Sequence, residues 1–483
     1  MSSKLKQLSK ESLVYGLSGV IGRFIGIFLV PIYTRIFVPS DYGVLDLIAV
    51  FSGIVGILII LGLDSAQGFY FYSTDDIADK KSTLSTSVAF QFALSVVLCA
   101  TLFSISVNLS KLVFGTDVYA TYFRLVALDL PFVAVTAFAQ KVLRLIRSPW
   151  KYMFFAFSKL ISNIVLTILM VVVWRKGIYG IYLSRLIVDA LYSLAAVYLI
   201  KSWLSRNLSW PRLKQLLKYG IPLVPAGISQ WVLGSANRYF LIRYSSLGNV
   251  GLYAVGNKIG SLMGLVTTSF QLAWGPFAFS IYREKDSKAV YADVLTYYLV
   301  LTSGIGIGLS LFAPEVLRIF TTRAYYGASP VVSYLAFGMI AYGAYYIVSI
   351  GVSVTKKTSH ISWTTAVAAG VNIVLNFLTI PRLGMIGAAI GVLISQWIST
   401  GLLYLVSQHF YPIPYRLKDV FVILGSSAIL IALGSRLQIP QLWLGIFAKT
   451  FIFLVFVAVL MITRVLPLDV FFRVFHSLGD RRK

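Results

Sequence analysis

The sequence predicts an all-α polytopic membrane protein with about fourteen transmembrane helices, and three observations predict this fold class. Hydrophobic residues make up 58% of the 483 residues, charged residues make up 12%, and the mean hydropathy is +0.83. Apolar stretches long enough to span a bilayer recur along the whole chain. They lack the strict alternation of a membrane-spanning strand, so helices remain as the way to satisfy the backbone in lipid.

Each crossing needs about 20 apolar residues, and windows of that length form two sets of six and a final pair. The first set covers residues 12–37, 43–63, 84–106, 118–140, 152–173 and 178–200. The second set covers residues 219–244, 250–282, 291–313, 330–355, 359–381 and 384–409. The final pair covers residues 418–434 and 442–463. We therefore predict a six-helix lobe at 1–205, a second at 206–412, and helices 13 and 14 with a cytoplasmic tail at 413–483.

The distribution of lysine and arginine between loops predicts the orientation. We count 26 basic residues on the side of the membrane that holds the N-terminus and 8 on the opposite side. The eight are Lys111, Arg175, Lys176, Arg243, Arg318, Arg323, Arg382 and Arg436. Because basic loops remain in the cytoplasm, this bias predicts that both termini are cytoplasmic and that the number of crossings is even.

Short segments recur at a nearly constant period. The segment Asn163 to Leu166 recurs as Asn372 to Leu375, and Gly177-Ile-Tyr-Gly recurs as Gly384-Met-Ile-Gly, at offsets of 209 and 207. Tyr15-Gly16 and Gly43 similarly match Tyr219-Gly220 and Gly251. Six helices per repeat give both lobes the same orientation, so we expect two parallel lobes related by an axis along the membrane normal.

Several function classes are disfavoured. The formal charge of +25 is spread over short loops, which is typical of membrane topology and not of nucleic-acid binding. One cysteine, Cys99, cannot form a disulfide within the chain, and three separated histidines predict no metal site. The segment Gly251 to Lys258 resembles a phosphate loop but has its lysine one residue late and no preceding strand.

Ionisable residues inside the apolar windows are candidates for function, because a charge in the bilayer core costs a few kcal/mol or more. The basic candidates for substrate binding are Arg23, Lys159, Arg185, Arg238 and Lys258. The acidic candidates for ion coupling are Asp46, Asp129 and Asp189. Each also has a structural interpretation, as a paired charge that joins helices or a long side chain that reaches the headgroups. Arg185 and Asp189 are four residues apart, so they share a helix face and can neutralise each other.

The chain resembles polysaccharide flippases of the Wzx type, in the superfamily that also contains multidrug extruders and lipid II flippases. The resemblance lies in Gly22 to Gly43, in Leu61-Gly62-Leu63 and in Asn237 to Ile259. It implies two six-helix lobes that face a cavity open alternately to each side of the bacterial cytoplasmic membrane. The sequence contains no nucleotide-binding domain, so we expect no cofactor, and H⁺ or Na⁺ is the candidate coupling ion because charge moved across the membrane potential can drive transport.

Intramembrane bases outnumber acids, which favours an anionic substrate, and an arginine fork matches phosphate oxygens. We therefore expect a polyprenyl-pyrophosphate-linked oligosaccharide as the substrate, with the polysaccharide polymerase machinery as a further candidate partner. Two alternatives remain open at this point. An ion-coupled drug extruder of the same fold should show unpaired acids in its cavity. A polymerase or ligase acting on lipid-linked sugars should have a long outer loop.

Overall fold

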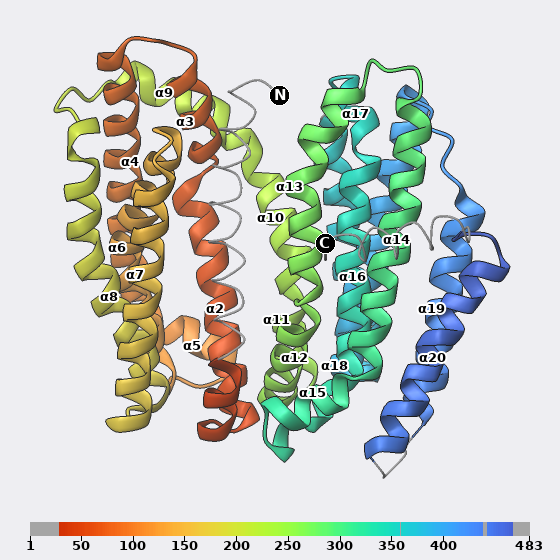
Figure 1. Ribbon diagram of the computed structural model, residues 1–483. Coiled ribbons are helices and arrows are strands. Elements are labelled where there is room, and N and C mark those ends of the chain that lie inside the picture. Colours follow the sequence, from red (N-terminus) through yellow and green to blue (C-terminus); the bar gives the residue numbers. More distant parts are fainter. Residues whose placement is uncertain (1–28, 358, 438–441, 467–483) are drawn as a thin grey trace, which may run out of the picture. The chain divides into compact units, whose positions relative to one another are not determined.

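The computed structural model describes residues 29–357, 359–437 and 442–466, which are helical and contain no strand (Figure 1). The chain divides into two compact units, residues 1–251 and residues 252–483. In the described residues, ten helices are long and apolar enough to cross a membrane. The polytopic all-α fold class is therefore confirmed. The count of fourteen crossings and the boundaries after residues 205 and 412 stay predictions.

Between residues 29 and 251, the first unit contains ten labelled helices and the beginning of an eleventh. They are α2 (Pro39–Ile60), α3 (Leu63–Tyr72), α4 (Ile77–Ser104), α5 (Ser106–Phe114), α6 (Ala120–Leu145), α7 (Pro149–Ile168), α8 (Gly177–Ile200), α9 (Trp210–Gly220), α10 (Val224–Trp231), α11 (Asn237–Tyr244) and the start of α12 (Leu247–Gly260).

The second unit contains the rest of α12 and the later helices. They are α13 (Met263–Ile281), α14 (Ser287–Leu311), α15 (Ala313–Phe320), α16 (Ser329–Val348), α17 (Ile350–Val354), α18 (Ser359–Phe410), α19 (Leu417–Arg436) and α20 (Leu442–Ile462). The last two coincide with the windows predicted at 418–434 and 442–463.

One predicted window is divided into shorter segments, and two others meet at a kink. The window at 219–244 contains Pro222 and Pro225, and it divides into α10, a π-helical segment (Val232–Ala236) and α11. The windows at 359–381 and 384–409 both lie within α18, in which two helical segments meet at a kink where the backbone of Gly384 is not helical. Proline removes a backbone donor, and a positive φ interrupts helical geometry.

One central helix organises the packing of each unit. In the first unit α6 packs against α2, α4, α7 and α8, and in the second α16 packs against α13, α14 and α18. The most apolar window of α6 is 61% buried and that of α16 is 83% buried. α6 begins at Ala120 and α16 at Ser329, a separation of 209 residues that equals the period of the sequence repeat.

Backbone geometry also repeats. Gly177 and Gly384, which are 207 residues apart, have φ values of +57° and +54°. Such values favour glycine, because a side chain at a positive φ is strained. Gly180 and Gly387, three residues later, both face the preceding helical segment. A Cβ added at Gly180 would lie 3.0 Å from Cβ of Met170, and one added at Gly387 would lie 2.4 Å from the carbonyl oxygen of Thr379. The same bend therefore occurs at the same place in both repeats.

Gly43 and Gly251 form a reciprocal contact between α2 and α12. A Cβ at Gly43 would lie 2.2 Å from the carbonyl oxygen of Leu247, four residues before Gly251. A Cβ at Gly251 would lie 1.8 Å from the carbonyl oxygen of Pro39, four residues before Gly43. The contact is thus symmetric about two glycines that the sequence repeat already relates, and only glycine permits so close an approach.

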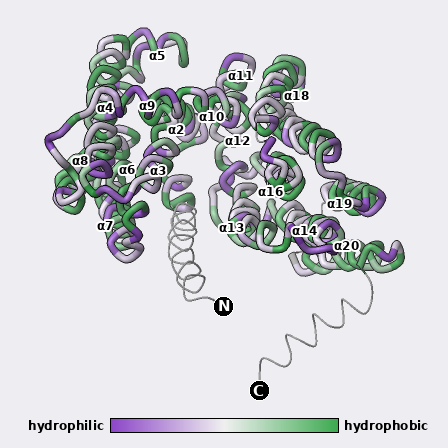
Figure 2. Tube along the Cα trace, turned by 90° about the horizontal axis from the view of Figure 1, so that it is seen from above, coloured by the Kyte–Doolittle hydropathy of each residue, from purple (hydrophilic) through white to green (hydrophobic). Residues whose placement is uncertain are grey.

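The outward faces of the final helices are strongly apolar. Trp443, Phe447 and Phe451 of α20 are 82%, 74% and 60% exposed. Figure 2 shows apolar residues along α20 and hydrophilic positions on α9. Exposed aromatic side chains in such number are stable against lipid and would be unfavourable in water.

We predict that Gly43→Ala lowers the thermal stability of the purified protein, because its methyl group collides with the backbone of α12. The expected loss is about 1–3 kcal/mol, the usual cost of overpacking. Gly56→Ala on the same helix meets no atom within 4 Å and serves as the control. Fluorescence-monitored melting in detergent measures both, and equal melting temperatures for the two variants would contradict the reciprocal contact.

Candidate functional site

Four charged residues predicted from the sequence meet inside the first unit. Asp129 lies on α6, Lys159 on α7, and Arg185 and Asp189 on α8. Arg185 Nε lies 2.8 Å from Asp129 Oδ2 and 3.9 Å from Asp189 Oδ2, and Lys159 forms an ion pair with Asp189 Oδ1. We call these four residues the charge cluster. With two acids and two bases it has no net charge.

Thr136 of α6 completes the charge cluster. Lys159 Nζ donates a hydrogen bond of 2.9 Å to Thr136 Oγ1, which lies 3.4 Å from Asp189 Oδ1. Thr136 follows Asp129 by seven residues, two helical turns, so both face α8. The ammonium group of Lys159 therefore contacts both the hydroxyl of Thr136 and the carboxylate of Asp189. The additional hydrogen bond reduces the cost of burying the two charges.

The members of the charge cluster differ in exposure. The side chains of Asp129 and Asp189 are 5% and 4% exposed, whereas that of Arg185 is 40% exposed. Arg185 reaches both carboxylates through Nε. Within the described part of the chain no hydrogen bond occupies its two terminal nitrogens, and none reaches Asp129 Oδ1. The cluster is therefore neutral in total, yet it presents an arginine fork on its accessible side.

A second buried ion pair joins α2 to α11. Arg238 Nε lies 3.0 Å from Asp46 Oδ2, and Nη1 donates to Asn237 Oδ1 at 3.1 Å and to the carbonyl oxygen of Gly234. The side chain of Arg238 is 4% exposed. Arg238 and Asp46, which the sequence suggested for substrate binding and ion coupling, are thus one paired unit.

The break in the seventh predicted window positions this pair. The π-helical segment Val232–Ala236 directly precedes α11 and contains Gly234, whose carbonyl oxygen accepts from Arg238. One turn earlier, Trp231 Nε1 donates a hydrogen bond of 3.0 Å to the carbonyl oxygen of Val50 on α2. The two contacts hold this stretch against α2, and π-helical turns are frequent at functional sites.

The other two predicted basic residues are placed differently. Lys258 is exposed near the end of α12, in the second unit, and forms no ion pair with the described residues. Arg23 lies outside the described residues. The structure therefore brings together six of the eight candidates, as the charge cluster and the pair of Asp46 with Arg238.

Sequence reasoning missed one ion pair that involves a basic residue inside a predicted membrane window. Lys449 of α20 lies 2.5 Å from Glu315 of α15, and its side chain is 9% exposed. Lys449 stands in the predicted window 442–463, so the rule that singled out the other charges also applies to it. Glu315 lies in a segment predicted to be outside the membrane, where a charged residue is common and does not indicate a functional site.

Comparison with known proteins identifies similar chains. A family model described as "Polysaccharide biosynthesis protein" matches residues 32–330. The chain is 22% identical over 287 residues to "Lsg locus putative protein 1" of Haemophilus influenzae, which covers 57% of this chain and 67% of that protein. It is 23% identical over 195 residues to an uncharacterized membrane protein of Methanocaldococcus jannaschii, which covers 38% of each.

Solved structures share the fold. The lipid II flippase MurJ in an inward closed conformation matches with a TM-score of 0.76 at 16% identity, covering 94% of this chain and 100% of that chain. An inward-facing multidrug resistance MATE family transporter of the MOP superfamily matches with a TM-score of 0.66 at 16% identity. The match covers 84% of this chain and 98% of that chain.

We predict that Asp189→Ala destabilises the protein by about 3 kcal/mol, because it leaves Lys159 partly buried without its carboxylate. Asp117→Ala, at an exposed acidic position, is the control and should change stability little. Melting of the two purified variants measures the difference. Equal stability would mean that the charge cluster does not hold α7 and α8 together.

Proposed function

The chain belongs to the polysaccharide biosynthesis protein family, and from that premise we propose that it is a flippase for polyprenyl-pyrophosphate-linked oligosaccharide repeat units. Family membership, together with the fold shared with a flippase, is the observation that carries the proposal. It also confirms the resemblance found in the sequence. The flippase would move its substrate from the cytoplasmic to the outer leaflet of the bacterial cytoplasmic membrane, with both termini in the cytoplasm.

The accessible fork of Arg185 supports an anionic substrate. Its Nε is held by Asp129, so the guanidinium is oriented before the substrate arrives, while the terminal nitrogens remain available. Two parallel N–H groups match two oxygens of a phosphate, and a preorganised donor loses less entropy on binding. Lys159, with 20% of its side chain exposed, would add a second positive charge beside it.

Arg23, Arg238 and Lys258 have other roles in this proposal. Lys258 is exposed and would contact the pyrophosphate or an acidic sugar directly. Arg238 is neutralised by Asp46, so it would act mainly by fixing α11 against α2. Arg23 stays a candidate for substrate contact from the sequence alone.

Transport by alternating access would follow from the repeated architecture. The hydrophilic headgroup would enter a cationic cavity while the polyprenyl chain stays in the bilayer, and rocking of the repeats would expose the headgroup outside. The bends at Gly177 and Gly384 are positions at which helices within a repeat can change angle.

The alternative of a drug extruder draws support from the MATE family structures with the same fold. Such a transporter should offer an unpaired carboxylate to a cationic compound. Asp46, Asp129 and Asp189 each lie within 3.9 Å of a basic side chain or form an ion pair with one. Arg185 is paired as well, but only through Nε, and its side chain is 40% exposed whereas those of Asp129 and Asp189 are 5% and 4% exposed, which favours the flippase.

A polymerase or ligase acting on the same lipid-linked sugars is less favoured. The segments predicted outside the membrane around 107–117 and 314–329 are occupied largely by the short helices α5 and α15 and by a 3-10 helix (Arg323–Ala328). They offer little room for a catalytic loop. The polymerase machinery is better regarded as a partner that would receive the translocated repeat unit.

An ion gradient would supply the energy. One elementary charge moved through 100 mV yields about 2.3 kcal/mol. Asp129 is the strongest candidate for carrying H⁺ or Na⁺, because its buried Oδ1 has no hydrogen-bond partner among the described residues. Binding of the ion to Asp129 would weaken its ion pair with Arg185. It would thereby couple the ion to the guanidinium group that is proposed to bind the substrate.

We predict that the protein restores surface polysaccharide in a flippase-deficient strain whose repeat unit it accepts. Lipid-linked repeat units should then be detected in the outer leaflet, using a sugar-specific reagent that does not cross the membrane. A strain that expresses the protein at normal levels but keeps the repeat units on the cytoplasmic face, for every repeat unit tested, would contradict the proposal.

Arg185→Lys should reduce this transport by roughly tenfold. The ammonium group of lysine keeps the positive charge beside Asp129, but it cannot make the bidentate hydrogen bonds of a guanidinium group to phosphate. Arg206→Lys, at an exposed loop position, is the matched control. Rates of outer-leaflet labelling, normalised to protein in the membrane, give the comparison. Unchanged transport in Arg185→Lys would remove this residue from substrate binding.

Asp129→Asn should abolish the dependence of transport on the ion gradient while leaving the protein folded, because an amide cannot exchange a proton or hold Na⁺ as strongly. Inverted membrane vesicles, treated with a protonophore or a sodium ionophore, measure that dependence. If the variant responds to both reagents as the wild type does, the coupling site lies elsewhere.

A further inference from the structure

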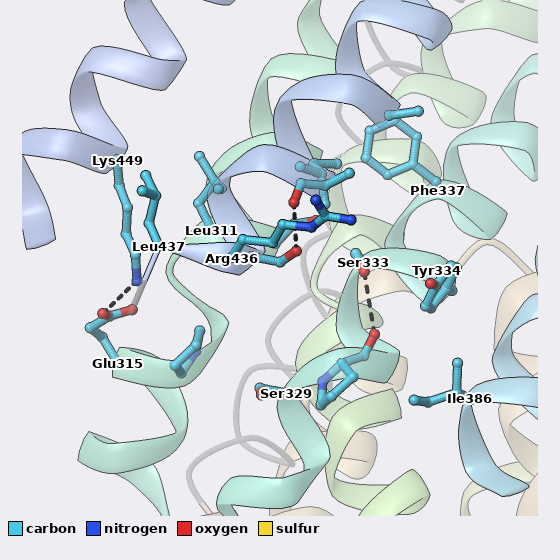
Figure 3. A pocket seen from close by; sticks show the side chains of 18 of the residues that line it. Leu311, Glu315, Ser329, Ser333, Tyr334, Phe337, Ile386, Arg436, Leu437 and Lys449 are labelled. Carbon is cyan, nitrogen blue, oxygen red and sulfur yellow. Dashed lines mark hydrogen bonds and ion pairs between the residues drawn. The ribbon is translucent and has the colours of Figure 1, made fainter. Parts of the chain in front are cut away.

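The second unit contains a pocket of about 1230 Å³ that the proposed transport does not use. It lies among the ends of α14, α15, α16 and α19 together with α18 and α20, and Figure 3 shows the side chains around it. The helices added after the repeat, α19 and α20, form one wall. Among the basic residues predicted on the outer side, Arg318 and Arg436 both line it. On the orientation predicted from the basic residues, the pocket is near the outer surface of the membrane.

Charge in this pocket is unbalanced. Lys449 and Glu315 form an ion pair at 2.5 Å, whereas Arg318 and Arg436 form no ion pair with the described residues. Arg318 follows Glu315 by three residues on α15, so both lie on the same face of that helix. Figure 3 shows Arg436 extending from α19 across the pocket in the direction of Ser333 on α16. Two arginines that have no ion-pair partner in the described ranges thus border one cavity.

Glu315 supplies a complementary acceptor. One carboxylate oxygen binds Lys449, while Oε2 is buried with no hydrogen-bond partner in the described part of the chain. A buried carboxylate oxygen without a partner is unfavourable, and it is satisfied when a hydroxyl group donates to it. The pocket therefore offers donors for an anion and an acceptor for a neighbouring hydroxyl.

The remaining lining is largely apolar. Leu311, Phe337, Leu424 and Ile431 line the same cavity as the two arginines. The outer faces of α19 and α20 are also apolar, with Phe421 and Phe447 each 74% exposed. A ligand that fits must carry a phosphate-like anion and a hydroxyl at one end and hydrocarbon at the other. A free inorganic anion would leave the apolar wall unfilled.

We propose that this pocket binds a glycerophospholipid of the outer leaflet, with Arg318 and Arg436 holding its phosphodiester and Glu315 accepting a hydrogen bond from a hydroxyl of its headgroup. The acyl chains lie along the apolar faces of α19 and α20. The bound lipid joins this helix pair to α14, α15 and α16, and it is a structural lipid distinct from the transported one.

Native mass spectrometry of the full chain in detergent, titrated with phosphatidylglycerol, tests the proposal. Arg318→Ala combined with Arg436→Ala should weaken lipid retention by about tenfold, because the charge-assisted hydrogen bonds to the phosphate are lost. Arg323→Ala is the control: this arginine is exposed at the same end of the unit and does not line the pocket. Equal retention in the double variant and the control would overturn the proposal.

Three further arms identify the ligand and test where it binds. Phosphatidylcholine has the phosphodiester but no donor for Glu315, so it should be retained more weakly than phosphatidylglycerol. Inorganic phosphate should not displace the lipid, and displacement at millimolar concentration would show a simple anion site instead. Ser333→Phe keeps all charges and fills the pocket, so it should also lose the lipid, and full retention there would place the lipid elsewhere.

Discussion

Lipid offers a charged side chain neither water nor counterions, and the arrangement of the described helices follows from that constraint. Lys159 with Asp189 joins α7 to α8, and Arg185 with Asp129 joins α8 to α6. A further pair joins α2 to α11. Because an unpaired charge at these positions would be costly, each pair fixes both the neighbours of a helix and its rotation. Arg185 is the most exposed member of the charge cluster, with 40% of its side chain exposed.

The internal repeat places these interactions on a common framework. α6 and α16 occupy the centre of their units at a separation of 209 residues, and the bends at Gly177 and Gly384 recur at a separation of 207. The polar pair of Asn163 with Thr167 in α7 corresponds to that of Asn372 with Asn376 in α18. The charges do not repeat in this way. The first unit holds the charge cluster, so the two halves share a scaffold and differ in chemistry.

Much of the architecture is predictable from the sequence, because hydropathy reports directly which segments lie in lipid. Final helices predicted at 418–434 and 442–463 occur at 417–436 and 442–462. Pairings are harder, since Arg238 and Asp46 are 192 residues apart and their contact depends on how two helices are rotated. The sequence correctly indicated that Arg185 and Asp189 share a helix face. It gave no reason to expect that Asp129 lies closer to Arg185 than Asp189 does. Likewise, the pocket beside Glu315 depends on an outer segment that folds into a helix instead of a loop.

The most direct test of the account is reconstitution of the purified protein in liposomes with a polyprenyl-pyrophosphate-linked oligosaccharide. A membrane-impermeant, sugar-specific reagent would follow the lipid-linked sugar as it changes leaflet. The account predicts protein-dependent, saturable movement of the pyrophosphate-linked sugar and little movement of a neutral glycolipid with the same sugar. Equal movement of both, or transport of an organic cation with no movement of either, would contradict an anion-selective flippase.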